Sequence, residues 1–483
     1  MFNPTRELLL NSTLWLCVGI LVLLVWQYVK LRGRPDSASQ AKENVVRLLS
    51  ARPVIALLFL CAVLRAGFVL YISYVAPLDV MQDIVSAQLL QRGESAYPPQ
   101  MAPLIVASLK SEPPRFSLGA LFPRLKQKEQ WETHGFLPLQ AHPPHLILLT
   151  VPFVALLGVH GAALAINLVS LSGLLLIVIL IYRSGAFQLS GRTACLIGIV
   201  SLSWEPVLSL LRQGQSGLLV GSLIVLGWYL LRRGHVAAAG IPISIAVSLK
   251  LYPGVLLVYL LFRYRRAFAS AMATLAVLMV GAIPLGGWRL FTEYSGIAGR
   301  VTAIYGGHPL NLSLLGILRK NGLQVSVPAF AAIVVGLIGG AVLLLVLQRG
   351  AVPGKRLLDL EFSLFAAFTL LVSPITWDHY LVILILPLVV IGNSVLNEKA
   401  NWASMIAFAL LALVIAIPAP SLVFPFGTQQ LARLVNVRTG SILTLALAVL
   451  TAWIARLQYQ AAADGSRAHR PYLANVVSTG GRS

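Results

Sequence analysis

Long apolar runs separated by short polar segments make up most of the 483-residue chain. Each run approaches the length of about 20 residues that an α-helix needs to cross a bilayer. This pattern predicts an all-α polytopic membrane protein with about 12–14 transmembrane helices. We expect spans at roughly 13–31, 51–74, 145–159, 162–182, 193–210, 216–232, 236–250, 251–262, 267–285, 327–348, 359–373, 379–396, 401–419 and 436–457.

The composition and charge fit this picture. Hydrophobic residues make up 58% of the chain and charged residues 11%, whereas about a quarter of the residues of a soluble domain are charged. The formal net charge is +21, and the basic residues occur in short runs between apolar segments, at 30–34, 232–233, 263–266 and 355–356. In a soluble protein this charge would indicate nucleic acid, but here it follows the positive-inside rule. We therefore expect no nucleic-acid partner.

The basic runs also predict orientation. Because the loop 30–52 is basic, it should be cytoplasmic, and the loops 75–144, 286–326 and 374–379 should then be external. We divide the chain into an extra N-terminal helix with a basic cytoplasmic loop (1–50), a transmembrane domain (51–460) and a disordered cytoplasmic tail (461–483). The three cysteines lie within apolar segments and lack a metal-binding spacing.

One region breaks the alternation of sides. The spans between Leu146 and Gln215 have the wrong parity for both ends to be external, so one of them should be a hairpin, a half-span or a broken helix. Glu205-Pro206 is the expected break, because proline removes a helix hydrogen bond and a carboxylate is costly in hydrocarbon.

An acidic stretch, 77–98, follows the span 51–74 directly. Asp79 and Asp83 are four residues apart, so in a helix they share one face. The chain holds only 16 acidic residues, which makes this pair at a membrane surface conspicuous. Asp79 could simply be the N-cap of a solvated helix. The alternative is a catalytic carboxylate at the mouth of a membrane cavity.

Other polar residues at membrane depth converge on the same side, and such residues are functional candidates. Each also has an ordinary explanation: Lys250 could snorkel to an interface, and the prolines at 253 and 374 could simply end helices. Arg65, inside the second span, could pair with an acidic group or point into a polar cavity. The candidates are His142, Arg212, Gln215, Lys250, Asn311, Trp377, Asp378 and His379.

Several kinds of chemistry lack their motifs. There is no glycine-rich nucleotide loop followed by Lys and Ser or Thr, and GQSG does not match a serine nucleophile elbow. His142 and His145 have no further ligands at a recognisable metal-binding spacing, so we expect no metal site. A carboxylate base facing an external cavity, with cations able to hold a phosphate, fits the remaining residues.

Five segments in one order resemble a known family. They are the acidic stretch 79–97, AHPPHLILLTVPF, the long segment from RQGQSG to SLKLYPG, NLSLLGILRK and SPITWDHY, spread over residues 51–400. Together they resemble the polytopic GT-C glycosyltransferases that use polyprenyl-phosphate sugars. The closest resemblance is to glycosyltransferase family 87, which contains polyprenol-phosphate-mannose-dependent α-mannosyltransferases and some arabinofuranosyltransferases.

This resemblance implies a GT-C-type fold and a site on the external face of the plasma membrane. Asp79 would take the place of the catalytic base, and His379, as a cation, would offset charge on the departing phosphate. From charge and position, Lys250 and Arg212 could hold that phosphate. The usual aromatic residues after the first Asp are replaced here by 80–83, so Asp83 could share or take the role of base.

The resemblance further implies the substrates: a polyprenyl-phosphate sugar as donor and a glycan, lipid or polysaccharide as acceptor; beyond this donor, the sequence assigns no cofactor and leaves metal dependence open. A transporter or flippase of lipid-linked glycans would also have many spans and midplane charges, but the sequence shows no internal repeat. A scaffold without chemistry would leave Arg65, Glu205 and Lys250 unexplained.

Overall fold

The structure is a computed structural model, and the part of the chain that it describes is helical. It describes residues 51–75, 77, 79–111, 139–187, 189–347, 354–397, 402–416 and 441–460, with scattered positions between 19 and 49. Regular structure in these ranges consists of helices, which confirms the all-α prediction. Most of the expected N-terminal segment 1–50 and the whole tail 461–483 lie outside the described residues.

Six of the described helices are long and apolar enough to cross a membrane, or seven if a bent pair counts as one span. Five shorter apolar helices accompany them, so several of the expected 12–14 spans are helices too short to cross alone. The helices are α4 (Arg52–Val75), α5 (Val80–Gln91), α6 (Ala102–Ser111), α8 (Pro144–Arg183), α9 (Gly191–Ser203), α10 (Glu205–Gln213), α11 (Gly217–Arg232), α12 (Val236–Leu249), η2 (Tyr252–Gly254), α13 (Val255–Arg263), α14 (Arg265–Tyr305), α15 (Leu314–Lys320), α16 (Val327–Leu347), α17 (Lys355–Val372), η3 (Asp378–Leu384), α18 (Ile385–Asn397), α19 (Trp402–Ile415) and Ser441–Gln460.

Three breaks interrupt the long helices. The helices α9 and α10 meet at Trp204 with a bend of 54°, which places the break directly before Glu205-Pro206, as predicted. Gly158 kinks α8 between the two spans expected there, and Gly287 kinks α14 where the expected external loop begins. Both glycines have positive φ (66° and 70°), a conformation that costs a residue with a side chain more than glycine.

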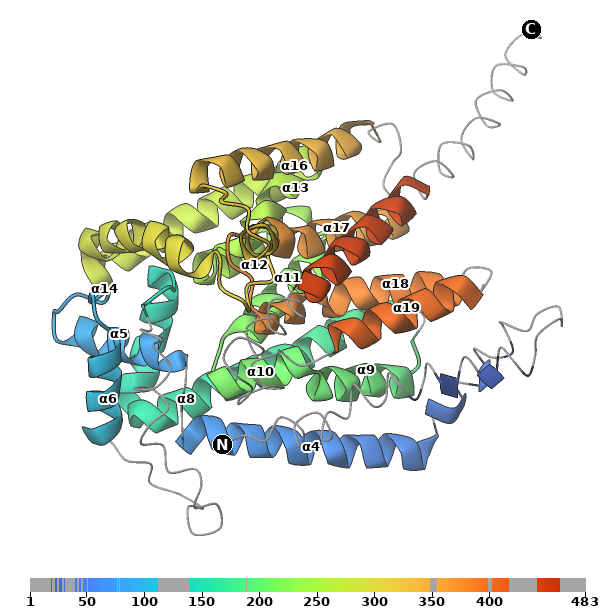
Figure 1. Cartoon of the computed structure of the whole chain (residues 1–483), viewed down its shortest axis with the longest axis horizontal. Coiled ribbons are helices and arrows are strands. Elements are labelled where there is room, and N and C mark those ends of the chain that lie inside the picture. Colours follow the sequence, from blue (N-terminus) through green and yellow to red (C-terminus); the bar gives the residue numbers. More distant parts are fainter. Residues whose placement is uncertain are drawn as a thin grey trace, which may run out of the picture.

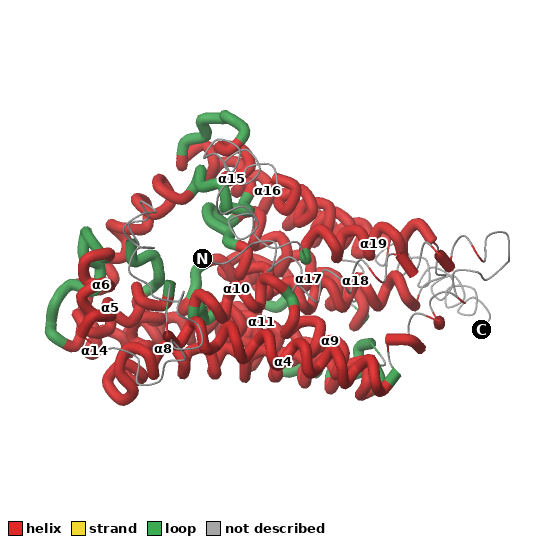
Figure 2. The backbone as a smooth tube through the Cα atoms, turned by 60° about the horizontal axis from the view of Figure 1, so that its bottom comes forward, coloured by secondary structure: helices red, strands yellow, loops and turns green. Residues whose placement is uncertain are grey.

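The helices form a bundle with a cap at one end. In Figures 1 and 2, α5 and α6 lie at one end of the long helices, beside α8 and α14. The cap has its own hydrophobic core, in which side chains such as Met81, Ile84 and Ile105 pack with Ile147 of α8 and Ile297 of α14. A larger core joins the remaining helices around residues such as Trp228. The cap contacts the bundle through Gln215, which precedes α11 and donates to Asp79.

Ion pairs inside the bundle compensate charges that would otherwise be costly. Glu205 accepts from Arg65 at 3.1 Å and from Arg212 at 3.3 Å, so Arg65 pairs with an acidic group, one of the two possibilities left open by the sequence. Elsewhere Arg263 pairs with the buried Glu361. These pairs join α4 to α10 and α13 to α17. Moving one helix away from the other would leave an uncompensated buried charge, which is strongly destabilising.

Candidate active site

The acidic stretch forms the start of α5. Asp79 occupies the N-cap position of α5, but its side chain makes no capping hydrogen bond. Its carboxylate instead accepts hydrogen bonds from the side-chain amides of Gln82 and Gln215. Asp79 is therefore held by side chains from both the cap and the bundle, and the simple helix-cap explanation does not describe its contacts.

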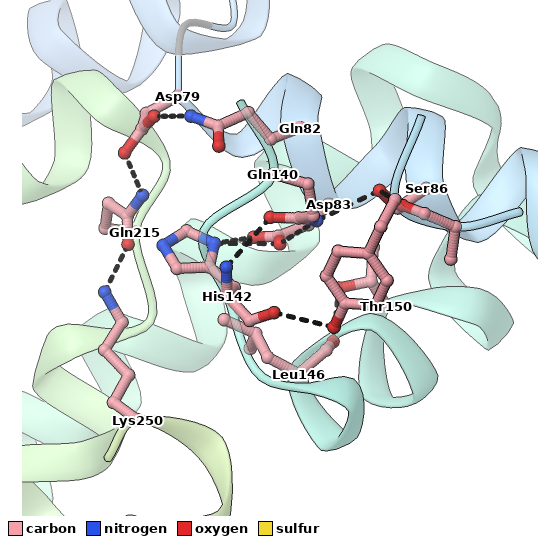
Figure 3. A network of polar contacts seen from close by, with 12 residues as sticks. Asp79, Gln82, Asp83, Ser86, Gln140, His142, Leu146, Thr150, Gln215 and Lys250 are labelled. Atoms are coloured by element: carbon pink, nitrogen blue, oxygen red, sulfur yellow. Dashed lines mark hydrogen bonds and ion pairs between the residues drawn. The ribbon is translucent and has the colours of Figure 1, made fainter. Parts of the chain in front are cut away.

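Gln215 links this carboxylate to a lysine. It follows Gly214, the C-cap of α10, whose φ of 71° is left-handed and whose missing side chain leaves room for Val80 of α5. The Nζ atom of Lys250 donates to Oε1 of Gln215 at 2.5 Å (Figure 3). Lys250 ends α12 in an extended conformation, and it is only 2% exposed. The amide thus joins a carboxylate and an ammonium group in one chain of hydrogen bonds.

An aromatic ring completes the environment of the lysine. The ammonium group of Lys250 lies 4.7 Å from the ring centroid of Tyr380, a cation–π arrangement. Tyr380 in turn stacks on Tyr252, with 4.7 Å between the ring centroids. Lys250 also interacts electrostatically with both Asp79 and Asp83. The lysine therefore points into the polar network and does not snorkel to an interface.

Asp83 belongs to a second, connected group. Nδ1 of His142 lies 2.8 and 3.0 Å from the two carboxylate oxygens of Asp83. Gln140, fully buried, donates to Asp83 at 3.1 Å and to Ser86 at 3.0 Å, and it accepts from the backbone N–H of His142 (Figure 3). These contacts fix the orientation of the imidazole, because a carboxylate on one ring nitrogen sets the role of the other.

His379 lies in the 3₁₀ helix η3 at the end of the bundle. Its side chain is buried, and Nδ1 is 3.4 Å from Oδ1 of Asp378. Among the described residues, neither ring nitrogen makes a hydrogen bond with good geometry. His379 also interacts electrostatically with Lys250 and Asp79.

Trp377 packs against aromatic residues of the segment 286–326. Its ring centroid is 5.8 Å from that of Tyr305 and 5.2 Å from that of His308. Burial, together with the charge of Lys320, lowers the pKa of His308 from 6.5 to about 4. Nδ1 of this neutral ring accepts from the backbone N–H of Leu310 at 3.2 Å.

Asn311 and Arg212 make contacts that the sequence did not predict. The Asn311 amide donates to the carbonyls of residues 305, 306 and 374 and accepts from the N–H groups of 313 and 376, so it ties the segments 305–313 and 374–376 together. Arg212 pairs with Glu205, as described above. A role in substrate binding stays a prediction for both residues.

The structure thus brings Asp79, Gln215, Lys250 and His379 into one electrostatic neighbourhood. Sequence reasoning did not single out Gln140, Gln82 or Tyr380 as site residues. Gln140 precedes the AHPPH motif, and its position between a loop and a helix start was the available signal. In the described ranges no three His, Cys, Asp or Glu residues are grouped so that they could hold a metal ion.

Chemically, the arrangement combines an acid–base group with cations. The carboxylate of Asp79 can accept a proton, while Lys250 and His379 can donate hydrogen bonds to an anion nearby. The Asp83–His142 pair adds a rigid polar surface on the cap side. Such a site suits a reaction in which a hydroxyl loses its proton as a negatively charged group departs.

Comparison with known proteins finds a family that is similar to part of the sequence. The sequence model of glycosyltransferase family 87 matches residues 141–374, which include His142, Gln215, Lys250 and Asn311. The chain is 26% identical, over 235 residues, to a polyprenol-phosphate-mannose-dependent α-(1-2)-phosphatidylinositol mannoside mannosyltransferase of Mycolicibacterium smegmatis (strain ATCC 700084 / mc(2)155). The match covers 47% of this chain and 52% of that protein, so the chain spans about half the length of this curated relative. No solved structure matches the chain. The match over residues 141–374, slightly less than half of the chain, shows that this part of the chain is similar to glycosyltransferase family 87.

Proposed function

We propose that this protein is a glycosyltransferase that moves a hexose, mannose-like, or a pentose from a polyprenyl-phosphate donor to a glycan, lipid or polysaccharide acceptor. The observation that carries the proposal is the chain of hydrogen bonds from Asp79 through Gln215 to Lys250. It places a proton acceptor and a cation in one buried network between cap and bundle. The family match and the name of the mannosyltransferase relative support the same class of reaction.

In the proposed reaction the acceptor hydroxyl attacks the anomeric carbon of the donor sugar. The new glycosidic bond forms while the bond between this carbon and the phosphate oxygen breaks, which inverts the configuration. Asp79 takes the hydroxyl proton, and the lipid phosphate leaves with the bonding electron pair. A base of this kind must lie within hydrogen-bond reach of the hydroxyl.

Cations stabilise the departing phosphate in this proposal. Lys250 is buried within the site, and His379 makes no well-aligned hydrogen bond among the described residues. In this proposal both side chains donate hydrogen bonds to a phosphate oxygen. Fixed donors of this kind stabilise charge that develops in the transition state. Arg212, which pairs with Glu205, contributes its positive charge at longer range.

The acceptor side is assigned to the Asp83–His142 pair. Asp83 holds the ring by Nδ1, and Gln140 accepts from the backbone N–H of His142 and donates to Asp83, so Nε2 presents a fixed polar atom to an acceptor hydroxyl. Trp377 offers an aromatic surface of the kind that packs against sugar rings. Asn311 acts as a positioning residue, because it ties the segments that carry Trp377 and His308.

The proposed setting is the plasma membrane, with the site facing the periplasm or the cell exterior. Cysteine introduced in place of Arg300, on α14, should react with an impermeant thiol reagent in intact cells if this orientation holds. A cysteine in place of Arg266 should react only after permeabilisation. The reverse pattern would refute the orientation.

The direct test is transfer by the purified full-length protein. The protein is incubated with polyprenyl-phosphate mannose labelled in the sugar and with an extract of membrane glycolipids. The label that enters the product is measured, and the released lipid phosphate is quantified. Equimolar product and lipid phosphate are expected, with inverted anomeric configuration. Movement of the intact lipid across vesicle membranes without transfer would identify a transporter instead.

A further inference from the structure

Tyr380 lies in the candidate active site, yet the reaction proposed above gives it no role. It follows Asp378 and His379 in η3, and these consecutive side chains point in different directions because a 3₁₀ helix has about three residues per turn. The ring of Tyr380 is half-buried. It meets the ring of His379 edge to face, with 4.8 Å between the ring centroids.

The contact between Tyr380 and Lys250 is of a kind that orients a cation. Nζ of Lys250 lies 4.7 Å from the ring centroid, inside the limit of about 6 Å for a cation–π contact. Lys250 is 2% exposed, and a cation–π contact contributes more in such a desolvated place than at a surface. The same ammonium group donates to Oε1 of Gln215. The ring and the amide together hold the ammonium group in place.

A second aromatic side chain fixes the ring of Tyr380. Tyr252 stacks on it, with 4.7 Å between the ring centroids and 25° between the ring planes. The backbone carbonyl of Tyr252 accepts from the hydroxyl of Thr369 on α17, which fixes Tyr252 in turn. Stacking of this kind favours one orientation of the ring, so its face stays directed at the lysine.

The charges around Lys250 show why an uncharged partner matters. Asp79 and Asp83 of the cap attract the ammonium group, and His379 interacts with it from η3. A lysine without the ring of Tyr380 would gain by closing onto Asp79, or by losing its proton, because burial disfavours a charge. Either change would withdraw the cation from a phosphate.

We propose that Tyr380 is a positioning residue that keeps Lys250 available as a cation for the lipid phosphate. The face of its ring supports the ammonium group without neutralising it. This inference rests on the proposed function, in which Lys250 holds the phosphate of a polyprenyl-phosphate donor. The hydroxyl of Tyr380 has no part in the contact, so phenylalanine at this position serves equally well.

The test measures the Kd of polyprenyl phosphate, the donor without its sugar, for the purified full-length protein from neutral to alkaline pH. Tyr380→Leu should weaken binding by roughly 30-fold, which corresponds to the about 2 kcal/mol of a desolvated cation–π contact. Binding by this variant should also be lost at a lower pH than in the wild type, because the ring favours the charged form of Lys250. Tyr380→Phe should match the wild type in both respects.

A trifluorinated phenylalanine at position 380 tests the contact without a change of shape. Fluorine withdraws the negative charge of the ring face, so this protein should bind polyprenyl phosphate more weakly than Tyr380→Phe does, and it remains informative where Tyr380→Leu does not fold. Tyr182→Leu is the matched control, because it removes an exposed tyrosine ring near the end of α8. It should leave the Kd unchanged.

Wild-type affinity in both Tyr380→Leu and the fluorinated protein would overturn the inference. Equal weakening in Tyr380→Phe and Tyr380→Leu would also overturn it, because the role would then belong to the hydroxyl. Sugar transfer is measured on the same preparations. A wild type that binds polyprenyl phosphate but transfers no sugar would refute the proposed function alone, since the Kd values still decide the role of Tyr380. A wild type that does not bind polyprenyl phosphate would refute both.

Discussion

Replacing Asp79 with asparagine separates basicity from shape. Asparagine can still accept from Gln215 through Oδ1, which preserves the bond from Gln215 to Lys250. Its Nδ2 then faces Gln82, whose Oε1 is buried and, in the described part of the chain, has no hydrogen-bond partner. A turn of the Gln82 amide supplies the acceptor that Nδ2 needs. The network therefore tolerates the substitution, and the loss is confined to the proton acceptor.

The size of the effect follows from the role of a general base. Such a base contributes about 10²- to 10⁴-fold to a rate, or about 2.7–5.4 kcal/mol of activation free energy. We expect the single-turnover rate of Asp79→Asn to fall by this factor while donor affinity survives. Asp83→Asn should be milder, because Asp83 is held by His142 and Gln140 on the cap side and serves to orient the acceptor.

The assay is single-turnover transfer with saturating polyprenyl-phosphate sugar, with donor binding measured separately. Glu94→Gln is the matched control, because it neutralises an exposed carboxylate just beyond the end of α5. A nearly inactive Asp83→Asn beside a nearly normal Asp79→Asn would exchange the two roles. Full rates in both variants would refute a carboxylate mechanism.

Three further predictions concern Lys250, the buried charges around Glu205 and the loop that contains His308. Lys250→Met should lower turnover by roughly 10- to 150-fold in a folded protein, because one charge-assisted contact to the phosphate is lost, and unchanged kinetics would remove Lys250 from the site. Glu205→Gln should lower the free energy of unfolding by about 3–5 kcal/mol in thermal or denaturant unfolding, because Arg65 and Arg212 then face an uncharged amide; a stability equal to wild type would show that the ion pairs contribute little. Because the pKa of His308 is lowered from 6.5 to about 4 in the folded protein, the unfolded loop binds more protons than the folded loop between these pH values. The folded loop should therefore lose stability as the pH drops from 6.5 toward 4, and the hydrogen-exchange protection factors of 306–326 should fall. His308→Asn keeps an acceptor for the N–H of Leu310 and should remove this dependence; the same pH dependence in the variant would exclude His308 as its source.

Local chemistry explains what could be predicted from the sequence. The break before Glu205-Pro206 follows from a proline and a carboxylate in an apolar run, and the structure places the bend there. The end of α12 at Leu249 follows similarly from the polar Lys250 and from Pro253. Because Asp79 and Lys250 each stood at the end of an apolar run, their convergence at one end of the bundle could be expected.

Long-range pairing could not be predicted in this way. The contact between Arg65 and Glu205 joins residues 140 positions apart, and either could have found another partner. The sequence indicated Asn311 as a candidate substrate-binding residue, yet its amide forms hydrogen bonds with backbone groups of two segments. The number of crossings also differed, because hydropathy does not tell a short helix packed inside a bundle from a full span.

The amide of Gln215 explains how a base and a cation can share one buried site. A direct ion pair between Asp79 and Lys250 would engage each charge with the other and leave neither for substrate. An intervening amide donates to the carboxylate and accepts from the ammonium group, so both stay oriented while their charges remain available. This arrangement depends on Gly214, because a side chain there would collide with Val80 and push α5 away from the bundle. The polar chemistry of the site is thus set by the close approach of the Gly214 backbone to the Val80 side chain, and it would be lost if the cap moved away from the bundle.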